Sequence, residues 1–428
     1  MLDIKLIREN PGMVRDSLRK RGDAEKENML EELVRTDVEW RKAQEKANAL
    51  KAERNRISRQ IAEAKKAKAD ASGLLARSSQ IPKEIEALDK ETLRLREGMD
   101  GMLMRLPNIL HESVPVGKDD SENQVVRTWG EPRPFDFELK NHGELAELLG
   151  LVDFDRAAKV TGAGFNYLKG SLALLDMALV RFAVDFMVAR GYVFVEPPYM
   201  MRRSAYEGVT DLGDFESVMY KIEKEDLYLI ATSEHPMAAM FMGEIIDEDA
   251  LPIKLVGFSP CFRREIGAHG VDTKGLFRMH QFNKVEQFVF CRPEDSWTFH
   301  EELQKNSELM FQGLELPYRV MNVCTGDIGN LAAKKYDIEL WFPRQGKYGE
   351  ATSCSNDTDY QARRLGIRCG KHGSDKKSVP HTLNNTAIAT SRTMVAILEN
   401  YQNADGTVTV PKALRQYMGG IKTLGTPK

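Results

Sequence analysis

Two closely spaced residues in the middle of the chain carry charges that could bind a small charged substrate. Arg263 and Glu265 lie two positions apart, and after a long glycine-containing loop the chain alternates again through Glu286 and Phe288. Side chains two positions apart on a β-strand face the same side, so we expect a hairpin with Arg263 and Glu265 on one face. A guanidinium and a carboxylate that face one cavity can hold an anion and an amine together. Taken alone, however, this hairpin favours a surface ion-pair ladder.

The sequence lacks the glycine-rich motifs that usually bind nucleotide phosphates. It has no G-x-x-x-x-G-K-[ST] loop, and the Gly-Ala-Gly at residues 162–164 lacks the third glycine of a dinucleotide fingerprint. Phosphate binding would therefore depend on arginines. The five cysteines lie far apart and form no C-x-x-C pair, so neither a disulfide framework nor a zinc site is indicated: Cys261, Cys291, Cys324, Cys354 and Cys369.

The candidate residues belong to a region that is typical of an α+β fold. Beyond about residue 110, short alternating runs mix with helical patterns, which predicts antiparallel strands flanked by helices. Pro107, Pro115 and Gly117, followed by the polar residues 118–123, indicate a linker. We therefore expect a domain boundary near residue 110.

The first hundred residues have a different texture and predict two long helices. Apolar residues recur at alternating spacings of three and four, as in a coiled coil. The helix-breaking residues 70–73 separate the two patterns, and so short a connection makes the helices antiparallel. The first seam contains Leu30, Leu33, Trp40, Ala47, Leu50, Ile57, Ile61 and Ala64, with Asp37, Gln44 and Arg54 as polar interruptions, and the second contains Ile81, Ile85, Leu88, Thr92, Leu95, Met99, Met102 and Leu106.

Such an arm is most often a spacer or a dimerisation element. A second interpretation depends on basic residues that crowd the far half of the first helix and could contact phosphates: Arg54, Arg56, Arg59, Lys65, Lys66 and Lys68. Alone, this charge run is more typical of a solvated helix face. The net charge of -3 also argues against non-specific nucleic-acid binding by the whole molecule.

Length and composition place the chain among ordinary globular proteins. Its 428 residues correspond to two or three domain equivalents, and 42% hydrophobic with 29% charged residues exclude collagen-like and disordered classes. It has no apolar run of about 18 residues and no N-terminal signal sequence. We therefore expect a cytoplasmic protein without a membrane partner.

The order of several motifs resembles class II aminoacyl-tRNA synthetases and, more narrowly, the seryl-tRNA synthetase family. Gly191-Tyr192 leads to Pro197-Pro198, and Thr-Ser-Glu follows at residues 232–234. Then come Phe-Arg-Arg-Glu at residues 262–265 with residues 278–282, Ser-Cys-Ser-Asn at residues 353–356, and residues 384–392. The resemblance extends over nearly the whole chain. It implies an N-terminal antiparallel coiled-coil arm, residues 1–110, and a class II catalytic domain built on an antiparallel sheet flanked by helices, residues 111–428.

The family's reaction joins ATP and L-serine into seryl-adenylate and then transfers the seryl group to the 3′ end of tRNA. By resemblance, Arg263 bridges the serine carboxylate and the α-phosphate, Glu265 accepts from the adenine amino group, and Phe282 stacks on the ring. Arg392, near the start of an amphipathic helix, would reach the γ-phosphate. The implied ATP-binding residues are Arg263, Arg264, Glu265, Met279, His280, Gln281, Phe282, Glu350, Ala351, Thr352, Ser353 and Arg392.

The resemblance also implies a metal site and an amino-acid site. Glu350 and Ser353 would bind Mg²⁺, which prefers hard oxygen ligands. Thr232 and Glu234 would hold the serine ammonium, while Glu286 with either Asn384 or Thr386 would receive the hydroxyl. A site built to pair a hydroxyl rejects alanine and glycine because its buried polar groups are otherwise left unpaired.

Three partners follow from the resemblance. The basic cluster on the arm would contact the long variable arm of serine tRNA by backbone and shape, with selenocysteine tRNA as a second candidate acceptor. The helix through residues 178–190 would form a homodimer interface, although Phe182, Phe186 and Val188 are equally typical of an internal core helix.

Two departures and three alternatives accompany this interpretation. The third motif, residues 383–392, has small polar or apolar residues where many bacterial members have glycines, and Gly349 stands where an arginine is expected. The alternatives are a paralogue that loads a carrier protein, a catalytically inactive RNA-binding relative, and an enzyme for threonine. The arm disfavours the first, and the retained site residues disfavour the second. A zinc-dependent threonine site would need Cys and His ligands that do not assemble here.

Overall fold

The computed structural model describes residues 1–265, 275–371 and 373–425. Internal contacts divide the chain into two compact units, Met1–Ile109 and Leu110–Lys428. The glycine-containing loop expected in the hairpin lies outside the described residues at 266–274. Among the described residues, none of the helices is long and apolar enough to cross a membrane.

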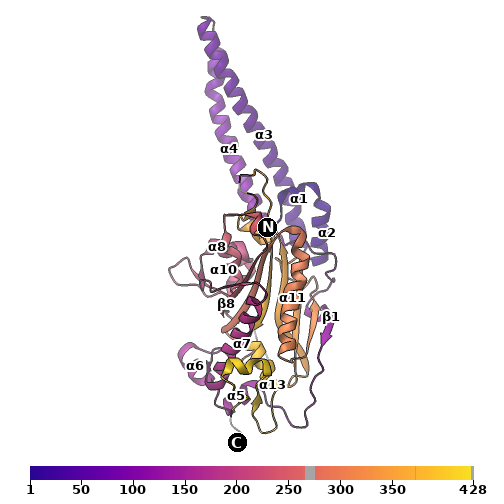
Figure 1. Cartoon of the computed structure of the whole chain (residues 1–428). Helices are drawn as coiled ribbons and strands as arrows, with labels where there is room; N and C mark the ends of the chain where they lie inside the picture. Colours follow the sequence, from indigo (N-terminus) through magenta and orange to yellow (C-terminus); the bar gives the residue numbers. More distant parts are fainter. Residues whose placement is uncertain (266–274, 372, 426–428) are drawn as a thin grey trace. The chain divides into compact units, whose positions relative to one another are not determined.

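The N-terminal unit is a bundle of helices dominated by one antiparallel pair (Figure 1). The short helices α1 (Ile4–Glu9) and α2 (Pro11–Arg21) precede α3 (Ala24–Lys66) and α4 (Ser72–Arg105). The central part of the predicted seams is confirmed, because the two helices bury Ile57, Ile81 and Ile85 against each other with Leu50, Ile61 and Leu74 at the margin. At the end of the second seam, α4 buries Leu103 rather than Met102, and Leu106 lies beyond the helix. The prediction that residues 70–73 all break the helix was wrong, since α4 already begins at Ser72.

Asp37 is more than a polar interruption of the first seam. Its side chain is buried, and both carboxylate oxygens accept hydrogen bonds from Arg8 of α1, at 2.6 to 3.1 Å. Arg41, one turn further along α3, donates to the same carboxylate at 3.0 Å. A buried carboxylate is tolerated when it is paired and hydrogen-bonded. Asp37 therefore anchors the first short helix to the long one.

The C-terminal unit is built on an eight-stranded sheet, as the α+β pattern predicted. The strand order is β1-β10-β11-β12-β14-β9-β8-β4, and every neighbouring pair is antiparallel except β4 with β8. Their bounds are β1 (Gln124–Trp129), β4 (Val193–Val195), β8 (Ile253–Phe262), β9 (Gln281–Cys291), β10 (Tyr318–Asn322), β11 (Lys334–Phe342), β12 (Lys347–Thr358) and β14 (His381–Ala389).

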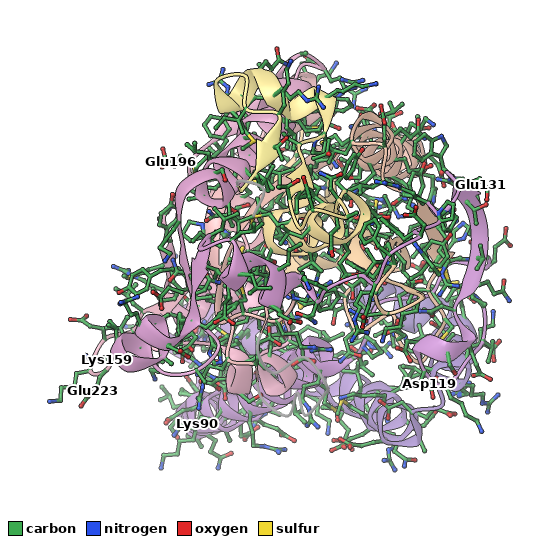
Figure 2. All side chains as sticks on the ribbon, turned by 90° about the horizontal axis from the view of Figure 1, so that it is seen from below. Lys90, Asp119, Glu131, Lys159, Glu196 and Glu223 are labelled. Atoms are coloured by element: carbon green, nitrogen blue, oxygen red, sulfur yellow. The ribbon has the colours of Figure 1, made fainter. Side chains whose placement is uncertain are left out.

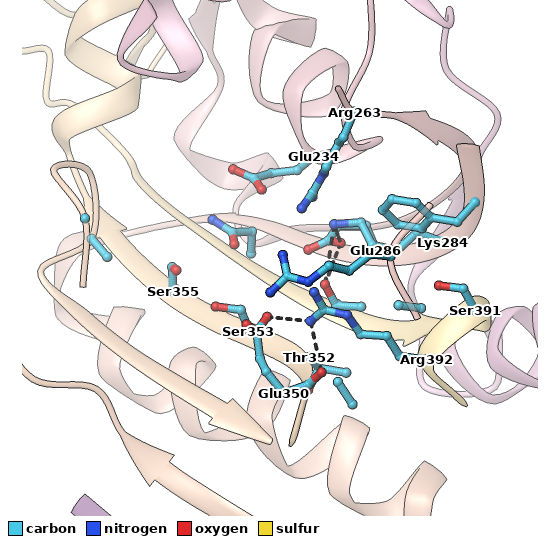
Figure 3. Close-up of a pocket in the computed structure, with 18 of the residues that line it drawn as sticks. Glu234, Arg263, Lys284, Glu286, Glu350, Thr352, Ser353, Ser355, Ser391 and Arg392 are labelled. Atoms are coloured by element: carbon cyan, nitrogen blue, oxygen red, sulfur yellow. Dashed lines mark hydrogen bonds and ion pairs between the residues drawn. The ribbon is translucent and has the colours of Figure 1, made fainter. Parts of the chain in front are cut away.

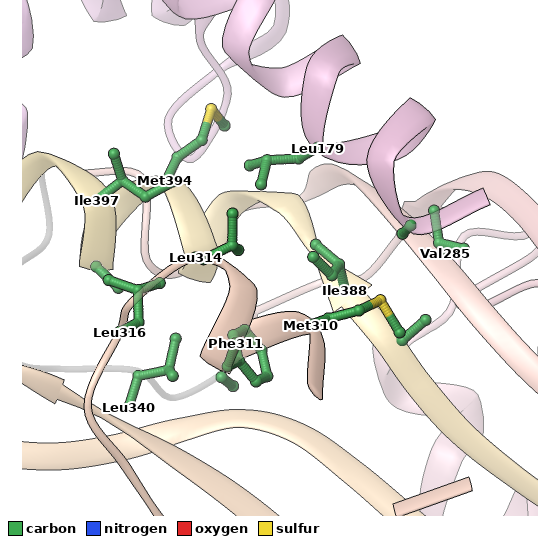
Figure 4. Close-up of a cluster of buried hydrophobic side chains, with 14 of the residues drawn as sticks. Leu179, Val285, Met310, Phe311, Leu314, Leu316, Leu340, Ile388, Met394 and Ile397 are labelled. Carbon is green, nitrogen blue, oxygen red and sulfur yellow. The ribbon is translucent and has the colours of Figure 1, made fainter. Parts of the chain in front are cut away.

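One face of this sheet packs against three long helices, α7 (Gly170–Val188), α11 (Ser296–Gly313) and α13 (Thr390–Asn400). Val285, Ile388 and Leu340 of the sheet meet Leu179, Met310 and Ile397 of the helices in the main hydrophobic core, which Figure 4 shows in close-up. Burial of this apolar surface is the main stabilising contribution to the unit. The predicted helix at residues 178–190 therefore exists, but it begins eight residues earlier and ends at Val188.

The opposite face is only partly covered. Phe288 and Phe290 of β9 alternate with Val285 and Val289, and they pack in a second core with helices α8 (Arg203–Val209), α10 (Glu234–Ala238) and α12 (Tyr360–Arg364). Because residues of equal parity share a face, Phe282, Lys284 and Glu286 lie on this second face. The part of the face that the short helices leave open contains the candidate site.

The remaining elements are short and connect these layers. Exposed charged side chains of the connections, such as Lys159, Glu196 and Glu223, point outward at the periphery (Figure 2). The short connecting elements are α5 (His142–Leu148), α6 (Phe154–Thr161), α9 (Leu212–Phe215), β2 (Val152–Asp153), β3 (Tyr167–Leu168), β5 (Met200–Met201), β6 (Tyr228–Leu229), β7 (Ile245–Ile246), β13 (Arg368–Cys369), β15 (Val408–Thr409) and β16 (Thr423–Leu424). The 3₁₀ turns are η1 (Asp120–Glu122), η2 (Glu216–Val218), η3 (Ala239–Phe241), η4 (Glu248–Ala250), η5 (Pro293–Asp295) and η6 (Lys412–Met418).

Candidate active site

A polar cavity of about 350 Å³ lies on the open face of the sheet (Figure 3). Its walls come from the segment that follows β8, from β9, β12 and β14, and from the start of α13. The cavity brings together thirteen of the predicted site residues: Glu234, Arg263, Glu265, Met279, Phe282, Glu286, Glu350, Ala351, Thr352, Ser353, Asn384, Thr386 and Arg392. Residues that are far apart in sequence therefore share one solvent-accessible chamber.

Arg263 and Glu265 border the cavity, but they do not lie on a strand. Strand β8 ends at Phe262, so the predicted strand alternation does not apply to them. The backbone N–H of Arg263 still donates to His280 O at 2.9 Å. This hydrogen bond extends the antiparallel pairing of β8 with β9 by one residue beyond Phe262 and Gln281. The guanidinium of Arg263 lies 5.4 Å from the centre of the Phe282 ring and its Nε donates to Ala231 O. This arginine is therefore fixed beside an aromatic ring.

A β-bulge explains how Glu350 and Ser353 reach the same cavity. In a regular strand, residues three positions apart face opposite sides. The pairing of β11 with β12 shifts between Ile338 and Glu339, so that Ala351 is an extra residue in β12. Bulges commonly re-aim side chains next to functional sites. Here the bulge lets Glu350 join Ser353 at the cavity wall.

Glu350 faces the arginine of the third motif. Arg392 Nη1 lies 2.9 Å from Glu350 Oε1 and also donates to the Glu350 carbonyl at 2.9 Å. Burial would raise the pKa of Glu350, but the positive charges of Arg392 and Lys335 outweigh it and hold that pKa below its ordinary value. Glu350 therefore offers an ionised, half-exposed carboxylate. With the Ser353 hydroxyl it forms a hard-oxygen donor pair, which suits Mg²⁺ that keeps water and phosphate oxygens in its shell.

Phe277 and Gly349 complete this end of the cavity. The guanidinium of Arg392 lies 5.4 Å from the Phe277 ring centre, and Phe277 packs edge-on against Phe342. A Cβ at Gly349 would lie 2.9 Å from Phe342, so any larger side chain would displace that ring. The missing arginine at residue 349 thus coincides with an aromatic pair that fills its space. None of residues 383–392 has a positive φ, so their departure from glycine causes no backbone strain there.

The opposite end of the cavity holds buried carboxyl groups. Glu286 Oε2 lies 2.5 Å from Lys284 Nζ and accepts from Thr386 Oγ1 at 3.1 Å. Glu234 Oε1 accepts from Gln361 Nε2 at 3.3 Å. Burial raises the pKa values of both Glu234 and Glu286, and each is opposed by the charge of Lys284. This end is therefore a desolvated, acidic site suited to an ammonium group and a hydroxyl.

Four predicted residues lie outside the wall of this cavity. Thr232 is buried, and its hydroxyl accepts from the N–H of Glu234 at 3.1 Å, so it holds the start of α10. The N–H of Arg264 donates to Val218 O, and His280 stacks on Phe165 and contacts Tyr220 OH. Gln281 borders a smaller neighbouring cavity. The structure thus gives these residues supporting positions around the site.

Several cavity residues escaped the sequence interpretation. Lys284 follows from the same alternation as Phe282 and Glu286, so the strand pattern alone could have found it. Phe277, Asp357 and Ser391 had no such signal, because their contribution depends on bulges and on the packing of distant segments.

The basic cluster of the N-terminal unit has the exposure that an RNA contact requires. All six residues lie on α3 or directly after it, and all are exposed. None of these six side chains forms an ion pair with another residue that the structure describes. Neighbouring basic residues differ, because Lys51 pairs with Asp89 and Arg77 pairs with Glu53 and Glu84.

Comparison with known proteins agrees with the fold and the pocket. The "tRNA synthetase class II core domain (G, H, P, S and T)" matches residues 218–401, and the "Seryl-tRNA synthetase N-terminal domain" matches residues 1–110. The serine–tRNA ligase of Methanocella arvoryzae is 59% identical over 99% of this chain and 100% of its own length.

Two solved structures are similar over the whole chain. The seryl-tRNA synthetase of Pyrococcus horikoshii, solved with ATP, has a TM-score of 0.97 and 50% identity and covers 100% of both chains. The cytoplasmic serine–tRNA ligase of Naegleria fowleri, solved with AMP, has a TM-score of 0.92 and 36% identity and covers 100% of this chain and 99% of its own.

The antiparallel sheet with its arginine- and glutamate-lined pocket defines a class II aminoacyl-tRNA synthetase. The N-terminal helical unit and the full-length similarity narrow the class further. The chain belongs to the seryl-tRNA synthetase family, whose members are ATP-dependent ligases that join serine to tRNA.

Proposed function

We propose that this cavity activates L-serine with ATP and that the residues at its two ends have separate tasks. The observation that carries the proposal is the placement of an aromatic–arginine end and an acidic, hydroxyl-lined end in one chamber. We assign residues 111–428 to catalysis and residues 1–110 to tRNA binding. A tRNA ligase works where translation takes place, so we also propose a cytoplasmic location.

The first reaction needs alignment more than it needs an enzyme nucleophile. The serine carboxylate attacks the α-phosphorus, the bond from that phosphorus to the α,β-bridging oxygen breaks, and pyrophosphate leaves with that oxygen. Arg263 would hold the carboxylate and an α-phosphate oxygen together, which suits a planar and permanently charged fork. Its position between the two ends of the cavity supports this role. Such positioning and charge stabilisation supply most of the rate.

The aromatic–arginine end would bind the nucleotide. Phe282 offers its ring face to adenine, and Glu265 offers an acceptor to the adenine amino group. Arg392, at the third residue of α13, would bind the γ-phosphate with help from the helix N-terminus. In the second step, the tRNA 3′ hydroxyl would attack the carbonyl of seryl-adenylate and release AMP.

Glu350 and Ser353 would hold Mg²⁺. Enzymes of this family use ATP as a substrate and Mg²⁺ as a cofactor, and the donor pair at this end fits that ion. When bound, the ion neutralises phosphate charge. Arg392 would then exchange part of its contact with Glu350 for a contact with the phosphates, because Mg²⁺ and Arg392 would compete for the same carboxylate.

The acidic end would select serine. Glu286 and Thr386 are already hydrogen-bonded to each other and would enclose the substrate hydroxyl. Glu234 would bind the ammonium, and Thr232 would position Glu234 by accepting a hydrogen bond from its backbone N–H. Lys284 balances the buried charge of Glu286. Bound alanine would leave Glu286 and Thr386 without the substrate hydroxyl as a partner. Buried polar groups without a partner cost binding free energy, so alanine should bind more weakly than serine.

Two macromolecular partners complete the proposal. The exposed basic cluster on α3 would contact tRNA phosphates, with serine tRNA and selenocysteine tRNA as the candidate acceptors. A homodimer is supported by exposed apolar residues on α7 and on the edge strand β4, namely Leu174, Met177, Val188, Val193 and Phe194. Contiguous exposed apolar residues commonly mark interfaces.

Serine-dependent exchange of pyrophosphate into ATP tests the adenylation step directly. We expect exchange with serine, none above background with alanine, and charging of serine tRNA by the full chain. Equal exchange with alanine or threonine would contradict the assigned amino-acid site. Exchange without tRNA charging would contradict the assigned acceptor.

A further inference from the structure

Asp357 occupies a specially shaped position at the acidic end of the cavity. The pairing of β12 with β14 shifts between Asn356 and Thr358, so Asp357 is a bulge residue. The next residue, Thr358, has a φ of 51°, which β-branched residues rarely adopt. A backbone outlier beside a pocket is a reason to look for a role. Here the outlier directs a 2% exposed carboxyl to the cavity wall.

Neighbouring side chains stabilise this bulge. The N–H of Thr358 donates to Asn356 Oδ1 at 3.0 Å, and Thr358 Oγ1 donates to the Asp357 carbonyl at 2.7 Å. Asn356 Nδ2 in turn donates to Ser296 Oγ at 3.3 Å. Three polar contacts therefore hold the backbone on both sides of Asp357.

The Asp357 side chain fixes one amide of the amino-acid site. Asn384 Nδ2 donates to Asp357 Oδ2 at 3.0 Å. An asparagine amide has a donor end and an acceptor end, and its hydrogen bonds determine which end faces a ligand. With the nitrogen held by Asp357, the oxygen of Asn384 is the atom that can accept from a substrate.

Asn384 and Thr386, the two residues that could receive the serine hydroxyl, have different hydrogen-bond partners. Thr386 bonds to Glu286, whereas Asn384 bonds to Asp357. Burial, together with the like charge of Glu234, raises the pKa of Asp357 well above its ordinary value. Asn384 and Asp357 thus belong to the Glu234 side of the site.

We propose that Asp357 is a positioning residue for the amino acid: it orients Asn384 so that the amide oxygen accepts from the substrate ammonium beside Glu234. This inference rests on the proposed function of the cavity. It gives Thr386 and Glu286 the hydroxyl, and it gives Asn384 and Glu234 the ammonium. Asp357 itself contributes the acceptor that holds the amide nitrogen of Asn384.

A double-mutant cycle in the full chain tests this inference by pyrophosphate exchange. Asp357→Val removes the acceptor for Asn384 at similar volume, and Asp357→Ala is a second variant in case valine prevents folding. We expect each of these two variants to raise the KM for serine about tenfold, because the charged substrate ammonium loses its hydrogen bond to the Asn384 amide oxygen. The KM for ATP should not rise equally. Asp357→Asn keeps an acceptor without charge, so its rise should be several times smaller.

If Asp357 acts through Asn384, the double variant with Asn384→Ala has the same serine KM as Asn384→Ala alone. Additive effects, an equal rise in both KM values, or an Asp357→Asn variant as impaired as Asp357→Val would overturn the inference. Absence of serine-dependent exchange by the unmodified chain would instead contradict the proposed function of the cavity. The two failures are therefore distinguishable.

Discussion

At the acidic end of the cavity, one buried glutamate should make serine binding depend on pH. Burial, with the like charge of Glu286, raises the pKa of Glu234 to about 7. A bound ammonium favours the ionised carboxylate. Serine therefore binds the deprotonated form, and the KM for serine should fall about tenfold from pH 6 to pH 8 and level off above.

The Glu234→Gln variant is the control for this pH profile. Its amide cannot titrate, so its KM for serine should be higher at every pH and should not fall over this range. A wild-type KM that stays flat or rises between pH 6 and pH 8 would contradict the assignment of Glu234 to the ammonium.

At the other end of the cavity, Glu350→Gln should weaken the response to Mg²⁺. The substitution keeps the shape of the side chain but removes the negative charge that a hard cation prefers. We expect the Mg²⁺ concentration for half-maximal exchange to rise about tenfold, in line with the loss of a charged contact of this kind. The KM for serine should change little. Binding of Mn²⁺ with ATP, followed by electron paramagnetic resonance, gives a readout independent of turnover, and an unchanged affinity there would exclude Glu350 as a ligand.

At the scale of elements, the long helices were predictable and the bulges were not. Ile57, Ile81 and Ile85 form a seam that spacing alone identified, because a helix repeats with a fixed period. The positions of Glu350 and Asp357 depend on extra residues in β12, and no local pattern marks which residue of a strand is unpaired. Most of the charged residues predicted for the site line the cavity, but Lys284 and Asp357 were missed, and Thr232 lies outside the cavity wall.

The helix α3 carries a prediction of its own. Replacing Arg54, Arg56 and Arg59 with glutamine should raise the KM for tRNA about tenfold or more, because lost phosphate contacts weaken binding strongly at low salt. Pyrophosphate exchange should be unaffected. The matched control replaces Arg35, Lys42 and Lys46, three exposed basic residues nearer the start of α3, in the same way. Equal effects of the two triple variants, or an equal loss of exchange, would contradict a tRNA contact at the far half of the helix.

At the scale of the whole molecule, the exposed apolar residues of α7 and β4 predict a dimer. Met177 is 53% exposed and Val193 is 61% exposed, although both are apolar. Met177→Asp places a charge in the proposed interface and should shift the sedimentation of the chain from dimer to monomer. Leu93→Asp, at an equally exposed apolar residue of α4, is the control and should leave the assembly unchanged. A wild-type chain that sediments as a monomer would contradict the interface.

The most direct test of the account measures both Michaelis constants in pyrophosphate exchange for two variants side by side. Thr386→Val keeps the volume of the side chain but removes the hydroxyl bonded to Glu286, and Phe282→Ala removes the ring proposed to stack on adenine. The account predicts a crossed result: Thr386→Val raises the KM for serine, and Phe282→Ala raises the KM for ATP. If each variant raised both constants equally, the cavity would not have separate ends for the amino acid and the nucleotide, and the central claim would be wrong.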